Sequence, residues 1–140
     1  MTTYPSTATT DRREHAQWPV AGLFLDALTR RDFSAMADSL EHDVRFRALV
    51  PSGPFELTGA EDTAGRFERW FGGDDGFEIV DASIGQVGTC LYLRWRVRMH
   101  AASAPHAARL AEQHAFARAG QRIESLDLVC SGFHAEGASV

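Results

Sequence analysis

The chain has 140 residues, of which 44% are hydrophobic and 24% charged, and its formal net charge is −5. This length suits one domain with its own core, and the composition excludes a disordered or fibrous chain. The 14 Lys and Arg residues are scattered along the sequence, so they form no basic stripe for nucleic acid. We therefore expect a single folded domain that does not bind nucleic acid.

The N-terminal stretch, residues 1–16, is rich in Thr and Ser and lacks the apolar core of a signal peptide. No apolar run approaches the roughly 18 residues that a membrane helix needs. Cys90 and Cys130 are too few for a disulfide scaffold and have no metal-ligand spacing. We expect a flexible arm over residues 1–16, a domain over 17–134 and a tail over 135–140. We also expect a cytoplasmic location, with no membrane or metal binding.

Helices are predicted in three places. Over residues 18–29 the apolar residues recur at spacings of three and four, and Pro19 suits the first turn. Asp32 is placed to cap a second, shorter helix over residues 33–40. A third helix carries Phe67 and Phe71 on one face and stops at the glycines that follow.

Alternating apolar and polar residues predict strands in the rest of the chain. These segments are residues 43–50, 55–59, 77–88, 89–100, 110–118 and 122–133. The last four are joined mostly by glycine-containing turns, apart from a longer loop over 101–109, as in an antiparallel meander. The pattern predicts an α+β fold, with the helices on one face of a curved antiparallel sheet and a small-molecule cavity between them.

Three segments make the chain resemble the nuclear transport factor 2-like superfamily, and within it the SnoaL-like proteins: ALTRRDFSAMADSLEHDVRFRA, FELTGAEDTAGRFERWF and EQHAFARAGQRIESLDLVC. The resemblance covers about residues 18–133. It implies a cone-shaped barrel, whose sheet wraps around three N-terminal helices, and a homodimer. The superfamily includes isomerases, polyketide cyclases, dehydratases, epoxide hydrolases and noncatalytic binders, so the fold does not choose a function.

The resemblance permits a comparison with the ketosteroid isomerase mechanism, which uses an aspartate base and a tyrosine with a protonated aspartic acid as oxyanion donors. Phe24, Ala48 and Gln113 occupy the corresponding positions here. Phenylalanine offers no donor and alanine accepts no proton, so this mechanism is not expected. Gln113 alone retains a donor for an oxygen of the ligand.

The register of the closing hairpin decides which polar residues face the cavity. With the tip at residues 119–120, Gln113 pairs with Leu126 and Glu112 pairs with Asp127. The inner face then carries Gln113, Ala115, Ala117, Leu126, Leu128 and Cys130. The outer face carries Glu112, His114, Phe116, Ile123, Ser125 and Asp127. A slip of one residue would exchange the two faces on one strand.

These residues support two hypotheses. In the first, the protein binds a small, largely apolar molecule, such as a cyclic ketone or polyketide-type intermediate, in an internal cavity, and as an enzyme it would perform cofactor-independent isomerisation, cyclisation or dehydration. Gln113 then polarises an oxygen, and His114 with Asp127, or His100, carries the proton. In the second, it is a noncatalytic dimeric binding or interaction module, and His114 is a surface or interface residue held by neighbouring carboxylates.

Neither hypothesis needs a metal or another cofactor. In both, the predicted ligand-binding residues are Phe24, Phe46, Ala48, Trp95, Ala115, Leu126, Leu128 and Cys130. A titratable side chain that points into the cavity would favour the enzyme, because proton transfer needs a carrier beside the ligand.

Overall fold

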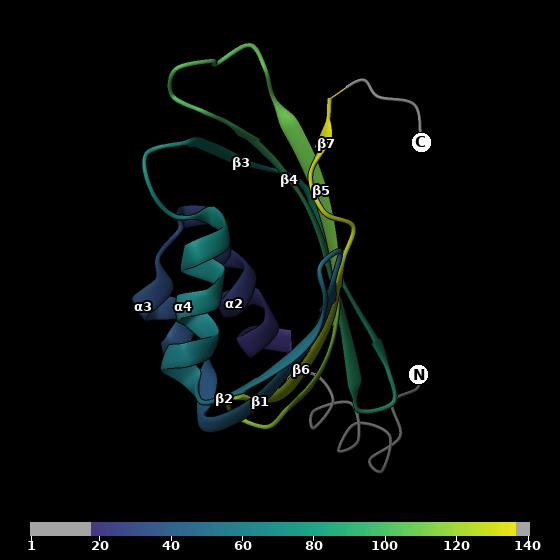
Figure 1. Cartoon of the computed structure of the whole chain (residues 1–140). Helices are drawn as coiled ribbons and strands as arrows, with labels where there is room; N and C mark the ends of the chain where they lie inside the picture. The colour runs from purple at the N-terminus through teal and green to yellow at the C-terminus, as the bar shows by residue number, and fades with distance from the viewer. Residues whose placement is uncertain (1–17, 137–140) are drawn as a thin grey trace.

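The computed structural model describes residues 18–136 of the chain. The predicted N-terminal arm, residues 1–16, and residues 137–140 of the predicted tail over 135–140 lie outside the described residues. Three helices pack against one face of a curved sheet (Figure 1), so the predicted α+β class is confirmed. No helix within residues 18–136 is long and apolar enough to cross a membrane.

The helices begin and end close to where the sequence predicts. Their bounds are Trp18–Arg30 for α2, Phe33–Asp38 for α3 and Ala60–Phe71 for α4. The Asp32 carboxylate caps α3 by accepting the N–H of Ala35 at 3.0 Å, as predicted. After α4 the chain passes through Gly73 at a φ of +91°, a conformation that favours glycine, and turns toward the sheet.

The sheet has seven strands in the order β2-β1-β6-β5-β4-β3, with β7 paired to β5. Their bounds are Leu40–Val50 for β1, Gly53–Thr58 for β2, Gly76–Val87 for β3, Cys90–His100 for β4, Arg109–Ala119 for β5, Ile123–Cys130 for β6 and His134–Ala135 for β7. The pairs β3–β4, β4–β5 and β5–β6 are antiparallel, as the meander predicted.

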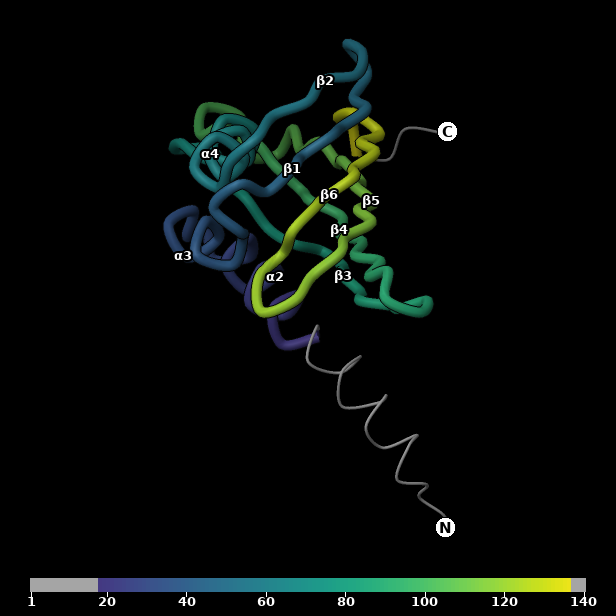
Figure 2. Tube along the Cα trace, turned by 90° about the horizontal axis from the view of Figure 1, so that it is seen from below, coloured from purple at the N-terminus to yellow at the C-terminus, as the bar shows by residue number. Residues whose placement is uncertain are grey.

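Two features of the sheet differ from the prediction. Strand β6 lies between β1 and β5 (Figure 2) and runs parallel to β1, so the sheet is mixed rather than wholly antiparallel. No hairpin joins β1 to β6, and their relative direction is set by the path of the chain between them. In addition, β2 and β3 are edge strands, so the sheet does not close into a barrel.

The predicted register of the closing hairpin is wrong by four residues. Gln113 pairs with Cys130, not with Leu126. The turn lies later than predicted, with the Gly120 N–H donating to the Arg122 carbonyl, and a register shift follows beyond Arg118. Because four is even, Gln113 keeps the predicted inner face. The irregularity also turns Ile123 into the core, fully buried, where the prediction placed it outside.

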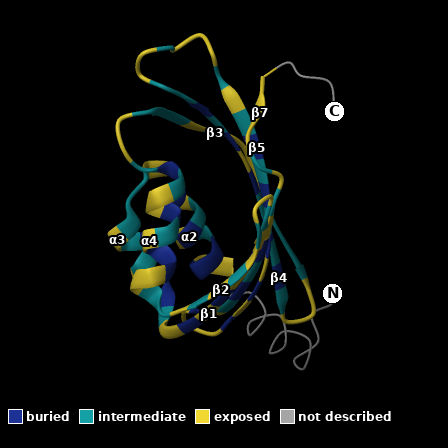
Figure 3. Ribbon diagram, viewed as in Figure 1, coloured by how far each residue is buried: buried dark blue, intermediate teal, exposed yellow. Residues whose placement is uncertain are grey.

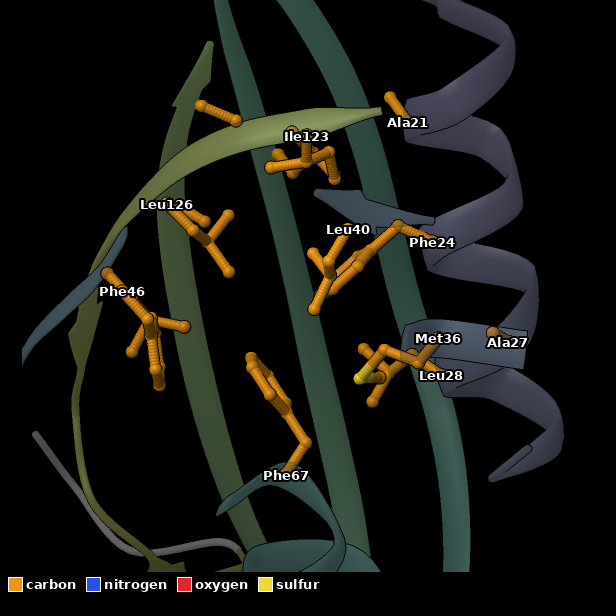
Figure 4. Packing of buried hydrophobic residues seen from close by; sticks show 14 of the residues in the cluster. Ala21, Phe24, Ala27, Leu28, Met36, Leu40, Phe46, Phe67, Ile123 and Leu126 are labelled. Carbon is orange, nitrogen blue, oxygen red and sulfur yellow. The ribbon is translucent and has the colours of Figure 1, made fainter. Parts of the chain in front are cut away.

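The core fills the space between the helices and the concave face of the sheet. Both the helices and the sheet carry buried residues (Figure 3), and these form one hydrophobic cluster. Phe46 of β1, Phe67 of α4 and Leu126 of β6 point toward one centre (Figure 4). The Phe46 and Phe67 rings stack at 5.5 Å, and Phe24 meets Phe67 edge-on at 5.6 Å. This aromatic packing fills the centre of the concave face.

Candidate ligand-binding site

A pocket of about 280 Å³ forms where four segments distant in the sequence meet. They are the β1–β2 turn, the end of α4, strand β5 and the end of β6 with the residues that follow. The apolar walls are Val50, Pro51, Trp70, Phe71 and Phe133, and the lining is completed by Ser52, Gln113, Cys130 and Gly132. We call this the Gln113 pocket.

One wall depends on a close approach between the segment after β6 and the β1–β2 turn. Gly132 has a φ of +79°, and a Cβ at this position would lie 2.6 Å from Pro51 Cγ. Glycine is therefore required here for both conformation and space. The next residue, Phe133, packs edge-on against Phe71 at 6.4 Å, and the Arg109 guanidinium lies 4.9 Å from the Phe133 ring centre.

Gln113 is the buried polar residue of this pocket, with 1% of its surface exposed. Alternation on β5 directs it to the concave face, where it pairs with Trp95 across the β4–β5 ladder. The Trp95 indole Nε1–H donates to Gln113 Oε1 at 2.7 Å. This side-chain pair makes it possible to bury an amide among apolar residues, because an unpaired carbonyl oxygen there would be costly.

The lining residues of the pocket include no Asp, Glu, His, Lys or Arg. Cys130 contributes a half-buried thiol, whose sulfur accepts the Gly132 N–H at 3.4 Å. No cluster of three or more potential metal ligands occurs among residues 18–136. What this arrangement offers a ligand is therefore an apolar pocket with one buried amide, the Cys130 thiol and the Ser52 hydroxyl.

The structure brings together only some of the predicted ligand-binding residues. Gln113 and Cys130 line the pocket. Seven other predicted residues lie at most 5% exposed in the packed core and do not line it: Phe24, Phe46, Ala48, Trp95, Ala115, Leu126 and Leu128. Trp70, Phe71 and Phe133 line the pocket but were not predicted from the sequence. The available signal was their aromatic character near the end of α4 and just after β6.

His114 lies on the convex face of the sheet, next in sequence to Gln113 but on the opposite side. Its Nε2 lies 2.6 Å from a Glu112 carboxylate oxygen, and its Nδ1 lies 2.5 Å from the Tyr92 hydroxyl. The Arg96 guanidinium also binds Glu112, at 2.8 Å, and its hydrogen bonds hold the pKa of Glu112 below the usual range. Glu112 therefore orients His114, as predicted, while remaining ionised.

Asp127 is not part of this cluster, contrary to the predicted pairing with Glu112. It stands opposite Phe116 in the β5–β6 ladder. The Arg47 guanidinium donates to both of its carboxylate oxygens at 2.7 Å, and these bonds lower the pKa of Asp127. The corrected register is the reason, because it places Asp127 opposite Phe116, four residues along β5 from Glu112.

His100 lies at the end of β4, outside the lining of the Gln113 pocket. Its ring packs directly over Gly76, where a Cβ would clash with the imidazole. Its Nδ1 lies 3.3 Å from the Ala101 carbonyl oxygen. The structure thus gives His100 a packing role at the edge of the sheet.

Apolar side chains also gather on the convex face. Leu49, Phe116 and Val129 are 51%, 46% and 47% exposed, and they lie on the neighbouring strands β1, β5 and β6. Leu49 stands opposite Val129 in the ladder. A groove of about 500 Å³ runs beside them. We call these three residues the convex patch.

Comparison with known proteins places the chain in a family. A family model described as a SnoaL-like domain matches residues 21–130. A protein described as a polyketide cyclase from Xanthomonas campestris pv. campestris superposes with a TM-score of 0.66 at 17% identity, over 84% of this chain and 90% of that chain. No match was found among curated proteins.

Two further solved structures share the fold. An LEH-like epoxide hydrolase from M. tuberculosis has a TM-score of 0.62 at 19% identity, over 81% of this chain and 80% of that chain. A protein described as a ketosteroid isomerase from Kribbella flavida has a TM-score of 0.60 at 17% identity, over 94% and 87% of the two chains. These identities establish a common fold and not a common activity. The family model, which spans most of the described residues, shows that the chain belongs to the SnoaL-like domain family.

Proposed function

We propose that the protein binds a small, neutral and largely apolar molecule in the Gln113 pocket without transforming it. The observation that carries this proposal is a pocket of about 280 Å³ with apolar walls and a single buried amide. Burial of apolar surface supplies affinity, and the amide supplies orientation. Small-molecule sites range from about 300 to 1,000 Å³. The volume here therefore suits a molecule no larger than a few fused rings.

The lining holds no carboxylate, imidazole, amine or guanidinium, and this favours binding over catalysis. His114 and Asp127 project from the convex face, so the sheet separates them from a molecule at Gln113. A general acid or base must come within hydrogen-bond reach of the proton that it moves. This arrangement speaks against isomerisation, cyclisation or dehydration at the pocket. The names of the structural neighbours, which refer to polyketides, ketosteroids and epoxides, agree with a cyclic, oxygen-bearing ligand.

The two cysteines of the chain provide a direct test. Cys130 lines the pocket, whereas Cys90 begins strand β4 outside it, and both thiols are half-buried. Indane, a neutral bicyclic hydrocarbon, should slow the labelling of Cys130 by monobromobimane and leave the labelling of Cys90 unchanged. Peptide mass spectrometry separates the two sites. Equal rates at Cys130 with and without saturating indane would refute ligand binding in this pocket.

We also propose that the convex patch joins two copies of the chain in a homodimer. Leu49, Phe116 and Val129 form an apolar centre on adjacent strands. Around it, carboxylates of the same chain bind Arg47, Arg94 and Arg96. A two-fold interface needs a patch that is complementary to itself, and an apolar centre with internally neutralised charges meets that need.

A further inference from the structure

The orientation of the Gln113 amide is fixed by the chemistry of its partner. The indole Nε1–H of Trp95 lies 2.7 Å from Gln113 Oε1. An indole nitrogen donates a hydrogen bond and cannot accept one. If the amide turned over, its NH₂ group would face the indole N–H. Two opposed donors are unfavourable here, because both side chains are at most 1% exposed and water cannot separate them. The amide therefore keeps its oxygen on Trp95.

This orientation leaves Nε2 of Gln113 for the pocket. Within residues 18–136 the Gln113 side chain forms one hydrogen bond, which Oε1 accepts from Trp95. Nε2 donates to no acceptor among these residues. Among the described residues, two side-chain polar atoms are buried from solvent and have no hydrogen-bond partner: Thr63 Oγ1 and Gln86 Oε1. Gln113 Nε2 is not one of them, so this nitrogen retains access to the pocket. Gln113 lines the pocket, and its amide hydrogens are the donors that a ligand meets there.

The neighbouring side chains do not offset this polarity. The sulfur of Cys130 already accepts the Gly132 N–H, and Ser52 lies in the exposed turn at the rim. Trp70 and Phe71 present apolar surface. The side chains around Gln113 thus supply a directional donor at a buried point without a competing acceptor. An anionic ligand would lack a cationic partner there, so a neutral acceptor fits best.

We propose that Trp95 is the positioning residue that sets the polarity of the Gln113 pocket, so that the pocket selects neutral molecules bearing a hydrogen-bond acceptor, such as ketones, esters or lactones. This selectivity rests on the proposed ligand binding. A carbonyl oxygen receives the Gln113 Nε2–H directly. A molecule of the same shape that only donates leaves its own N–H and the Gln113 donor unpaired in an apolar site, and such mismatches are strongly disfavoured.

Three bicyclic probes of nearly equal size test the selectivity: 1-indanone accepts, indole donates and indane does neither. Dissociation constants are measured by titration of ¹⁵N-labelled protein. We expect 1-indanone to bind about fivefold or more tightly than indole, the worth of roughly one buried hydrogen bond. The Gln113 side-chain N–H resonances should move with 1-indanone more than with indane. Equal affinities for 1-indanone and indole would overturn the proposal.

The role of Trp95 is tested by Trp95→Phe, which keeps an aromatic ring and removes the indole N–H. Freed from its partner, the amide can turn over, and the affinity ratio of 1-indanone to indole should fall to about one. Indane should bind within about twofold of the wild type, whereas a merely structural role would weaken all three probes together. An unchanged ratio in the variant would refute positioning by Trp95.

A second variant, Gln113→Leu, keeps the test open if Trp95→Phe does not fold. It should abolish the preference for 1-indanone and shift the Trp95 Nε1–H resonance, because the indole loses its acceptor. An unmoved indole resonance would contradict the assigned contact. If indane fails to bind the wild type, the proposed function itself is wrong. If indane binds and all three probes bind alike, ligand binding stands and only the selectivity fails.

Discussion

The two faces of strand β5 satisfy their polar groups in opposite ways. On the concave face, Gln113 has one side-chain partner, Trp95, and both are buried. On the convex face, the next residue, His114, joins a half-exposed chain from Tyr92 to Glu112 that water can also reach. The face that is rich in titratable groups lies outside the pocket, and the pocket has a single amide. Sequence neighbours on a strand thus need not share a function, because alternation separates them by the thickness of the sheet.

The largest expected difference between the faces is in packing. Phe67→Ala should lower the free energy of unfolding by about 3–5 kcal/mol, because it removes a fully buried ring from the centre of the core. Phe116→Ala on the convex face, where the ring is 46% exposed, should cost about 1 kcal/mol. Urea unfolding at low protein concentration measures both. Similar losses in the two variants would contradict the assignment of the faces.

The next largest effect concerns association through the convex patch. We expect the wild type at micromolar concentration to have twice the 15.4 kDa mass of the chain in sedimentation or light scattering. Val129→Glu places a charge in the apolar centre and should weaken association by about 2 kcal/mol or more, roughly thirtyfold. Val87→Glu, at an 81% exposed position away from the patch, is the matched control and should leave the mass unchanged. A monomeric wild type would rule out the dimer.

The Trp95–Gln113 pair should contribute more to stability than the pair on the convex face. Trp95→Phe leaves one polar atom of the buried amide without a partner, whichever way the amide turns, and should cost about 1–3 kcal/mol. The double variant Trp95→Phe/Gln113→Leu should recover part of this loss, because no polar atom then remains unpaired. Tyr92→Phe, which removes the hydroxyl near His114, should cost less than about 1 kcal/mol, since water can replace it. A larger loss from Tyr92→Phe would reverse the comparison.

The sequence predicted which side chains lie on each face of β5 better than it predicted the register of the β5–β6 hairpin. Period-two alternation placed Gln113 inside and His114 outside, and this survived an error of four residues because four is even. The error itself came from the turn, whose position and following irregularity depend on backbone geometry that residue types do not specify. Because of this error, Asp127 was predicted beside Glu112, and Ile123 was predicted on the outer face although its side chain is buried.

The pocket was harder to predict than the fold, because its walls come from segments that meet only through sheet curvature and loop packing. Pro51 and Gly132 approach so closely that a Cβ would not fit, yet they are separated by most of the chain. Trp70 near the end of α4 and Phe133 in the segment after β6 illustrate this, because nothing local indicates that these two aromatic residues share a pocket. The parallel pairing of β1 with β6 was missed for the same reason.

The smallest predicted effect is the response of the convex face to acid. The hydrogen bonds from Arg47 lower the pKa of Asp127, and those from Arg96 lower the pKa of Glu112. A carboxylate whose pKa is lowered in the folded state stabilises the fold fully above its unfolded pKa, about 4, and this stabilisation is lost as the pH falls through the folded pKa.

The free energy of unfolding should therefore decrease below about pH 4, and Asp127→Asn should flatten that decrease. Asp43→Asn, on the same strand as Arg47 but without a salt bridge to residues 18–136, is the control, and it should follow the wild-type curve more closely. Parallel acid profiles for the wild type and Asp127→Asn would show that the Arg47–Asp127 pair contributes nothing to the acid response.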